Sequence, residues 1–354
     1  MRRVGLVGFR GMVGSVLVQR MKEEGDFESF EPVFFSTSQV GAEIADANDL
    51  AALSKMDAIV SCQGGDYTSE IHPRLRKDGY KGIWIDAAST LRMKDDAVIV
   101  LDPVNLAVIE RARARGVRDF IGGNCTVSLM VMAMAGPIKQ GWVEWISTMT
   151  YQAASGAGAK NMQELVQQMG AVAAGAGDPA ASILDLDRRV SETLRSKEFP
   201  TAQFGVPLAA SLIPWIDSPV AGGRTREEWK SQAEANKILG LDPPLPIDGI
   251  CVRVGAMRCH SQALTIKLKK AVPVDEIEAC IRESNPWVKV VPNTREDTCT
   301  QLTPAAISGT LDVAIGRIHT MNMGPEYVAA FTVGDQLLWG AAEPLRRTLK
   351  LVLE

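Results

Sequence analysis

A cysteine stands where a predicted strand ends and an apolar helix begins. Gly122, Gly123 and Asn124 directly precede Cys125. A thiol in the first turn of a helix faces backbone N–H groups without helical partners and the positive end of the helix dipole. This setting favours the thiolate, and the same N–H groups can bind an oxyanion formed when the sulfur attacks a carbonyl carbon. The segment therefore predicts a cysteine nucleophile with a lowered pKa.

A cysteine nucleophile needs a partner that moves protons, and the chain has only three histidines. His260 lies near the start of a predicted strand, whereas His72 and His319 read as surface or loop residues. The spacing leaves open whether Cys125 and His260 meet. The other five cysteines read as core residues, and the six contain no CxxC pair, so we predict neither a disulfide framework nor a metal site.

Three glycines form a second candidate site. Gly8, Gly11 and Gly14 follow a predicted strand and open a predicted helix. Glycine permits the tight turn and lets N–H groups of a helix start approach a pyrophosphate closely. The spacing is GxxGxxG instead of the commoner GxGxxG, and an ordinary glycine-rich turn is the alternative, but the strand and helix around it favour a dinucleotide site.

The end of the second predicted strand bears on the choice of dinucleotide. An NAD-preferring fold places Asp or Glu there to bind the ribose diol. This chain has Ser36, Thr37 and Ser38, whose hydroxyls can donate to a 2′-phosphate, and Arg10 can add positive charge. We therefore predict NADP in preference to NAD; the alternative is that these residues are only a polar strand end.

The elements that must position these residues indicate a two-part α/β chain. Short apolar runs alternating with helical patterns predict a doubly wound, Rossmann-like parallel sheet in residues 1–124. Longer strand candidates then predict an α+β substrate and dimerisation domain with a mostly antiparallel sheet in residues 125–334. We expect a final helix in 335–354 to return to the first domain, and the apolar segment 204–217 to be buried by a partner subunit. The predicted strands are 4–7, 32–35, 58–61, 82–86, 98–101 and 119–121, followed by 143–151, 247–254, 263–269, 312–318 and 327–333.

Composition narrows the function classes. The 354 residues carry 38 Lys and Arg against 42 Asp and Glu, a net charge of −4 that offers no general attraction for nucleic acid or anionic lipid. The uncharged run 120–138 contains Gly and Pro and predicts a buried core helix of about a dozen residues instead of a membrane span. The uncharged run 4–9 is too short for a secretory signal, so we expect a cytoplasmic protein.

Taken together, these segments resemble the aspartate-β-semialdehyde dehydrogenase family, most closely its enterobacterial-type, NADP-dependent members. The matching segments are 8–15, 34–39, 62–67, 85–89, 122–126, 151–156, 226–230 and 253–260. The resemblance implies reduction of L-4-aspartyl phosphate by NADPH to L-aspartate 4-semialdehyde and phosphate, through a cysteine acyl-thioester. It also implies a homodimer and a place in the biosynthesis of lysine, threonine, methionine and diaminopimelate.

The resemblance also assigns roles to residues. It implies Cys125 as nucleophile, His260 as general acid/base and Gln152 as the residue that orients the reacting group. Arg253 would bind the substrate carboxylate and Glu227 its ammonium, and Arg92 and Lys230 would bind phosphate. Without it, Glu227 and Lys230 would read as a solvated ion pair and Arg92 as surface charge. The implied cofactor contacts are Gly8, Arg10, Gly11, Met12, Val13, Gly14, Thr37, Ser38, Gln63, Ser155, Gly156, Pro179 and Gln336.

Two segments depart from the family pattern. The stretch between Gln39 and Asp57 is short, which predicts a shortened loop near the adenosine end of the cofactor. Residues 171–178, just before Pro179, match poorly. Two alternatives are an N-acetyl-glutamyl-phosphate reductase, which would not need Glu227 for an acylated amine, and a non-enzymatic NADP-sensing protein, which would not need Cys125, His260 and Arg253 together.

Overall fold

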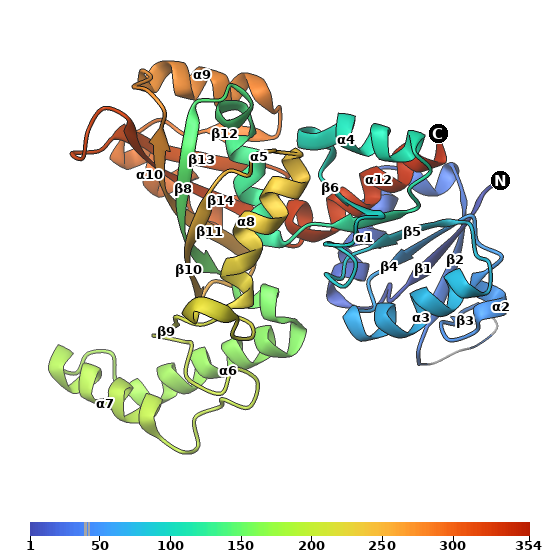
Figure 1. Cartoon of the computed structure of the whole chain (residues 1–354). Helices are drawn as coiled ribbons and strands as arrows, with labels where there is room; N and C mark the ends of the chain where they lie inside the picture. The colour runs from blue at the N-terminus through green and yellow to red at the C-terminus, as the bar shows by residue number, and fades with distance from the viewer. Residues whose placement is uncertain (39–40, 42) are drawn as a thin grey trace.

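The computed structural model contains two seven-stranded sheets, each packed with helices (Figure 1). It describes residues 1–38, 41 and 43–354. Part of the predicted short loop, Gln39, Val40 and Ala42, lies outside the described residues. The predicted two-part α/β fold is confirmed, while the predicted domain boundary at residues 124 and 125 stays a prediction.

The first sheet is parallel throughout, with the order β3-β2-β1-β4-β5-β7-β6. The chain leaves β1 towards β2 on one side and resumes with β4 on the other, which places a topological switch point beside the carboxyl end of β1. Its strands are β1 (Arg3–Val7), β2 (Glu31–Ser36), β3 (Ala45–Asp46), β4 (Ala58–Ser61), β5 (Ile83–Asp86), β6 (Ala97–Val100) and β7 (Asp119–Gly122).

Helices cover both faces of this sheet, as continuously apolar strands require. Leu17, Ile109 and Leu345 lie in one apolar cluster with strand residues of one face, and Leu53 and Ile71 lie in the cluster on the other. Helices α1, α4 and α12 therefore pack on one face, and α2 and α3 on the other. The helices are α1 (Met12–Glu23), α2 (Leu50–Leu53), α3 (Gly65–Lys77), α4 (Asp102–Ala114) and α12 (Glu343–Leu353).

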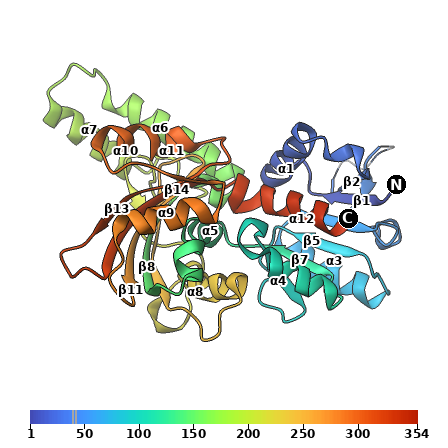
Figure 2. The same cartoon turned by 90° about the horizontal axis from the view of Figure 1, so that it is seen from above.

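The last helix returns to the first sheet. Figure 2 shows α12 between α1 and α4, far in sequence from both. Arg346 binds both carboxylate oxygens of Asp26 at 3.0 and 2.9 Å and also binds Glu343 on its own helix at 2.8 Å. All three side chains are buried, so the ion pairs hold α12 in place beside its apolar stripe.

The second sheet has the order β12-β13-β14-β11-β8-β10-β9. The pairs β12–β13 and β8–β10 are parallel and the other neighbours are antiparallel. This confirms the predicted, mostly antiparallel sheet. Its strands are β8 (Val143–Gln152), β9 (Leu212–Ile213), β10 (Ile247–Val254), β11 (Cys259–Leu268), β12 (Val288–Val290), β13 (Val313–Thr320) and β14 (Tyr327–Asp335).

One face of the second sheet is covered and the other is open within this chain. Apolar side chains of α5, α8 and α9 form the largest buried cluster with one face. Met149, Tyr151 and Ile250 lie on the opposite face and are 37–49% exposed. Helices α6 and α7 project away from both sheets (Figure 1). The remaining helices are α5 (Cys125–Lys139), α6 (Ala159–Ala176), α7 (Ile183–Arg195), α8 (Arg226–Leu239), α9 (Val274–Ser284), α10 (Arg295–Gln301) and α11 (Pro304–Ile307).

Two features differ from the predicted elements. Strand β11 begins at Cys259, four residues before the predicted start, and therefore carries His260. The short strands β3, β9 and β12 have too few residues to show an apolar period. Across the helices of residues 1–38, 41 and 43–354, none combines the length and apolarity needed to cross a membrane.

Candidate active site

A pocket of about 400 Å³ lies between the two sheets. Val13 from the first sheet's helix layer lines it, together with residues from the start of α5, from β8 and β10, and from the turn after β14. The predicted site residues among its walls are Val13, Arg92, Cys125, Gln152, Gly156, Glu227, Lys230, Arg253 and Gln336.

The start of α5 positions Cys125. Asn124 is the N-cap, and its Oδ1 accepts from the N–H groups of Thr126 and Val127 at 3.0 and 3.2 Å. The cap fixes the first turn, so Cys125 enters the pocket from the first helical position. Gly340, from the turn before α12, packs against it; a Cβ on Gly340 would lie only 2.9 Å from the Cβ of Cys125.

The structure brings Cys125 and His260 together, which the sequence left open. The Sγ of Cys125 lies 3.1 Å from Nε2 of His260, across 135 residues of sequence. The N–H of Ala153 donates to Nδ1 of His260 at 3.0 Å. A neutral imidazole whose Nδ1 accepts must carry its proton on Nε2. His260 therefore points a donor at the sulfur and at any oxygen that comes to lie beside it.

The predicted low pKa of Cys125 is wrong for the empty pocket. Burial raises the pKa of the thiol to about 12, and the negative charge of Glu227 adds to this, against smaller opposing effects of Arg253, Arg92 and Lys230. The helix start does not offset the loss of water around the sulfur. Burial, with a contribution from Arg253, holds the pKa of His260 well below its usual value of 6.5. The pair is thus a neutral thiol and a neutral imidazole.

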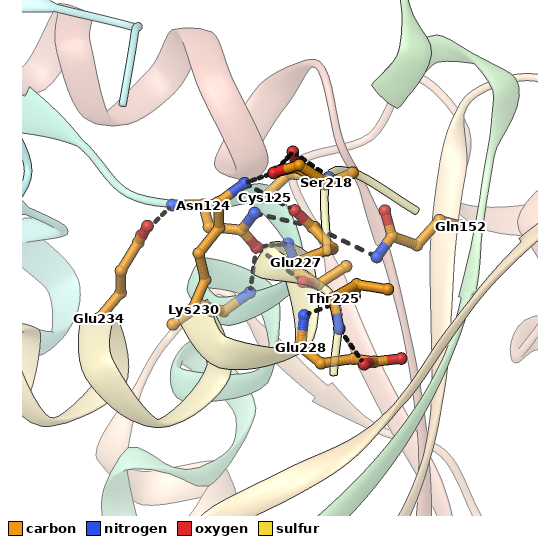
Figure 3. Close-up of polar contacts among 12 residues, drawn as sticks. Asn124, Cys125, Gln152, Ser218, Thr225, Glu227, Glu228, Lys230 and Glu234 are labelled. Carbon is orange, nitrogen blue, oxygen red and sulfur yellow. Dashed lines mark hydrogen bonds and ion pairs between the residues drawn. The ribbon is translucent and has the colours of Figure 1, made fainter. Parts of the chain in front are cut away.

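Glu227 is the polar centre of the pocket wall. Figure 3 shows it between the side chains of Asn124, Gln152 and Lys230. Asn124 Nδ2 donates to its Oε1 at 2.9 Å and Gln152 Nε2 at 3.2 Å, while Lys230 Nζ binds Oε2 at 2.9 Å. Burial would raise the pKa of Glu227, but Lys230 and these hydrogen bonds outweigh it and lower the pKa. Glu227 is therefore a buried carboxylate that stays charged.

Arg253 offers a charge without an acidic partner. It lies on β10, is 6% exposed, and its Nη1 donates to the carbonyl of Ala153 at 2.8 Å. Within the described part of the chain, Arg253 forms no ion pair. A buried guanidinium with only a carbonyl partner is costly in an empty pocket and well suited to a ligand carboxylate.

Arg92 and Lys230 lie in the wall of the same pocket and are buried, not on the surface. Arg92 Nε donates to the carbonyl of Gly122 at 2.6 Å, and its Nη1 binds Glu234 Oε1 at 3.2 Å. Packing against α8 removes Arg92 from solvent, which the charged sequence around it concealed. The i,i+3 pair of Lys230 with Glu227 exists, but buried instead of solvated.

Sequence reasoning missed three residues that hold this wall together. Asn124 was noted only as part of the approach to the cysteine. Glu234, 2% exposed, accepts from the N–H of Asn124 at 2.7 Å as well as from Arg92. Asp217 lines the pocket and binds Lys230 Nζ at 2.8 Å. Glu234 is two turns after Glu227 on one helix face, a spacing that could have indicated it; no sequence signal pointed to Asp217.

The glycine turn has the close packing that a dinucleotide cradle requires. Gly8 adopts a φ of +74°, and a Cβ there would meet the backbone of Cys62 at 2.8 Å. A Cβ on Gly14 would lie 2.2 Å from the carbonyl oxygen of Gly8. The turn leads into α1 at Met12 after Gly11, which provides no side-chain cap. The free N–H groups of this helix start thus remain available to phosphate oxygens.

Polar groups at the carboxyl end of β2 and in the pocket also fit a dinucleotide. Arg10 donates to Ser36 Oγ and to the Ser38 carbonyl, and Gln63 donates to Thr37 Oγ1 at 3.0 Å. This gathers the predicted hydroxyls and a guanidinium at the carboxyl end of β2. At the other end, the Oε1 atom of Gln336 is buried without a hydrogen-bond partner in the described structure, beside Cys125 in the pocket lining. An amide group on a ligand would satisfy it.

Three predicted cofactor contacts, Ser155, Gly156 and Pro179, lie far from the glycine turn in sequence. Gly156 closely approaches Arg253 and His260, since a Cβ there would lie 2.8 Å from Arg253 Nη1 and 3.2 Å from His260 Nε2. Ser155 is buried next to it and donates to the carbonyl of Arg258. Pro179 is exposed between α6 and α7, at the far end of a helix of roughly 27 Å, so a single chain does not bring it to this pocket.

Metal ligands are not grouped in the described structure: no three His, Cys, Asp or Glu side chains there form a candidate metal site. The polar groups at the pocket are the thiol of Cys125, the imidazole of His260, three cations, and the carboxylates that bind two of these cations.

Comparison with known proteins gives two family matches and several similar structures. Residues 3–112 match the family described as semialdehyde dehydrogenase, NAD binding domain, and residues 136–339 match semialdehyde dehydrogenase, dimerisation domain. The chain is 49% identical to an aspartate semialdehyde dehydrogenase from Francisella tularensis, with a TM-score of 0.97, covering 99% of this chain and 100% of that one.

More distant structures share the fold. Aspartate semialdehyde dehydrogenase II from Vibrio cholerae, complexed with ASA, is 22% identical with a TM-score of 0.79, covering 100% of this chain and 98% of that one. An aspartate semialdehyde dehydrogenase with NADP from Candida albicans is 15% identical with a TM-score of 0.66, covering 100% and 99%.

Proposed function

The chain belongs to the semialdehyde dehydrogenase family and is an enzyme, and on that premise we propose that it reduces L-4-aspartyl phosphate to L-aspartate 4-semialdehyde and phosphate with NADPH. The observation that carries the proposal is the buried guanidinium of Arg253, without an acidic partner among the described residues, in the same pocket as Cys125. A short substrate with a carboxylate near its reacting carbonyl satisfies both residues at once.

The rest of the substrate matches the opposite wall. Arg253 would bind the α-carboxylate through its planar fork, and the charged carboxylate of Glu227 would receive the α-ammonium. Gln152, which donates to Glu227, would orient the reacting group between them. Arg92 and Lys230 would bind the phosphate of the acyl phosphate.

Cys125 and His260 would carry the bond changes. The sulfur attacks the acyl carbon, the bond to the phosphate oxygen breaks, and the thiol proton leaves with phosphate, giving an acyl-thioester on Cys125. After reduction of the thioester, the tetrahedral oxygen carries negative charge, which the Nε2–H of His260 stabilises. Collapse releases the aldehyde and returns the sulfur, to which the same N–H donates.

The residues present fit a bound NADP, which supplies hydride in the reductive direction. Gly8, Gly11 and Gly14 would hold its pyrophosphate, and the hydroxyls of Thr37 and Ser38 with Arg10 would bind the 2′-phosphate. Gln336 would bind the carboxamide of the nicotinamide through its unpartnered Oε1. The further contacts proposed are Met12, Val13, Gln63, Ser155 and Gly156.

We also propose a homodimer that uses the open face of the second sheet. The match to a dimerisation domain and the half-exposed apolar residues Met149, Tyr151 and Ile250 support this. In such a dimer, the partner subunit would also cover Pro179, which is exposed in the single chain. Light scattering at micromolar concentration, compared for the wild type and Ile250→Lys, tests the dimer. A cytoplasmic location and supply of semialdehyde to lysine, threonine, methionine and diaminopimelate synthesis remain part of the proposal.

The experiment that tests the function is phosphate-dependent reduction of NADP by L-aspartate 4-semialdehyde, run beside N-acetyl-glutamate semialdehyde and with NAD in place of NADP. We expect turnover with the first substrate and NADP only. Cys125→Ala should abolish turnover while NADPH binding, followed by fluorescence, stays within about twofold of the wild type. Comparable rates with the acetylated substrate, which keeps the α-carboxylate but has no ammonium, would refute the role of Glu227. Comparable kcat/KM with NAD would refute the 2′-phosphate site.

A further inference from the structure

Lys230 is bound on two sides before any phosphate arrives. Its Nζ lies 2.9 Å from Glu227 Oε2 and 2.8 Å from Asp217 Oδ2. Burial would lower the pKa of Lys230, but the two carboxylates outweigh it and raise the pKa. The ammonium that would bind phosphate thus already has two carboxylate partners.

The second carboxylate, Asp217, is held firmly in its place. Its backbone has a φ of +73°, a left-handed conformation that Asp adopts more often than most other non-glycine residues. Its Oδ1 accepts from the N–H of Ser218 at 2.7 Å, and Trp215 Nε1 donates to its carbonyl at 2.9 Å. These contacts leave Oδ2 aimed at Lys230 in the wall of the pocket. The apolar segment 204–216 before Asp217 contains no other Asp or Glu.

The carboxylates in and beside the pocket equal its cations in number, so the pocket has no excess positive charge to attract an anion. Arg92, Lys230 and Arg253 contribute three positive charges, which the carboxylates of Glu227, Glu234 and Asp217 match. A phosphate oxygen bound to Lys230 Nζ at about 2.8 Å would lie about 4–5 Å from Asp217 Oδ2, because both would be bonded to one tetrahedral nitrogen. Like charges at that distance repel, although the 30% exposure of the Asp217 side chain lets water reduce the repulsion.

We infer that Asp217 is a counter-ion that weakens phosphate binding at Lys230, and so sets the affinity of the enzyme for phosphate below what Arg92 and Lys230 alone would give. The inference rests on the proposed function, because it takes Lys230 as the phosphate ligand. In the reductive direction phosphate is a product, and weaker binding speeds its release. Asp217 acts through its charge on Lys230 and does not touch the reacting atoms.

The test is Asp217→Asn, because asparagine adopts a left-handed backbone readily and keeps the shape of the side chain while removing its charge. We expect the KM for phosphate, measured in the oxidative direction at saturating semialdehyde and NADP, to fall about tenfold. The inhibition constant of phosphate in the reductive direction should fall by the same factor, while the KM for semialdehyde stays within about twofold. A phosphate KM that is unchanged or higher would overturn the inference.

Two controls separate charge from other causes. Glu31→Gln makes the same change in net charge in an exposed ion pair with Arg3, at the amino end of the first sheet, and should leave the phosphate KM unchanged. Asp217→Ala removes the hydrogen bonds as well as the charge, and should also lower the phosphate KM. A rise in the phosphate KM of both Asp217 variants would mean that Asp217 holds Lys230 in a productive position, and would refute the counter-ion role.

A binding measurement keeps the inference independent of turnover. Calorimetric titration of inorganic phosphate into the NADP-loaded enzyme should give a dissociation constant about tenfold lower for Asp217→Asn than for the wild type. Absence of phosphate-dependent turnover in the wild type would refute the proposed function. An active wild type whose phosphate affinity does not respond to Asp217→Asn would refute only this inference.

Discussion

Gly340 sets how closely the turn before α12 can approach the nucleophile, and its replacement by alanine gives a sharp test of the pocket geometry. The added methyl would lie 2.9 Å from the Cβ of Cys125 and 3.3 Å from its Cα. Carbon atoms in ordinary contact are about 3.5–4.0 Å apart, so Cys125 and residue 340 must separate by about 0.6–1.1 Å. The turn is packed between α5 and α1, so part of that shift must fall on the sulfur.

A displacement of this size is large for catalysis and small for folding. Misplacing a reacting group by about 1 Å costs on the order of 100-fold in rate, which is about 2.7 kcal/mol of activation free energy. Overpacking costs about 1–3 kcal/mol of stability, but alanine gains up to about 1 kcal/mol over glycine within a helix. We therefore expect kcat/KM to fall on the order of 100-fold while the free energy of unfolding falls by no more than about 2 kcal/mol.

The assay compares kcat/KM for NADP reduction with the rate of Cys125 alkylation and with urea unfolding. Gly170→Ala is the matched control, because Gly170 lies within α6 with open space where its Cβ would be. It should gain helix stability and keep wild-type activity. Wild-type kcat/KM in Gly340→Ala would show that the close approach to Cys125 plays no part in placing the sulfur, and would refute the reasoning.

Three further predictions concern the buried ionisable residues Arg253, His260 and Arg346. Arg253→Lys should lower kcat/KM for the semialdehyde by about 10–100-fold in steady-state assays, because an ammonium cannot replace two parallel N–H donors; an unchanged value would refute the carboxylate role. His260 has a pKa well below 6.5 when folded and about 6.5 when unfolded, so the unfolded chain binds more protons below pH 6.5. The unfolding free energy should therefore decrease by about 1.4 kcal/mol per pH unit from this residue as the pH falls below 6.5, and urea titrations at several pH values should show a shallower decrease for His260→Asn. Arg346→Ala should destabilise the protein by about 2–3 kcal/mol in urea unfolding, because Asp26 and Glu343 lose their buried guanidinium partner and keep only Lys350 and Arg20. A loss below about 1 kcal/mol would contradict the docking role of α12.

The fold was predictable wherever local sequence carries a period. The strands that match β1, β4 and β10 begin within one residue of their predicted starts, since each is a continuous or alternating apolar run. The early start of β11 was hidden because its first residues, from Cys259, mix polar and apolar side chains that are all buried. Strands buried on both faces lose the alternation that marks their ends.

The candidate site was predictable in its residue types but not in its electrostatics. The N-cap and glycines before Cys125 are a local pattern. The approach of His260 to Cys125, 135 residues away in sequence, depends instead on how β11 and β14 pack against α5. The pKa of Cys125 depends on how completely packing removes water, so the helix-start argument alone gave the wrong direction. Asp217 could not be predicted at all, because no sequence signal links the loop before α8 to Lys230, whereas the helical spacing of Glu234 from Glu227 could have indicated Glu234.

The docking of α12 also has a consequence for how the protein is made. Arg346 and its partner Asp26 are 320 residues apart in sequence, and the apolar cluster around β1 includes Leu345, Leu349 and Val352. The last strand of the first sheet, β7, ends at Gly122 and α12 ends at Leu353. At a synthesis rate of about 5–20 residues per second, the nascent first sheet therefore waits about 12–46 s for this helix. During translation the nucleotide-binding half therefore exposes apolar surface that only the last helix can bury, and the chain is most open to aggregation or chaperone binding in that interval.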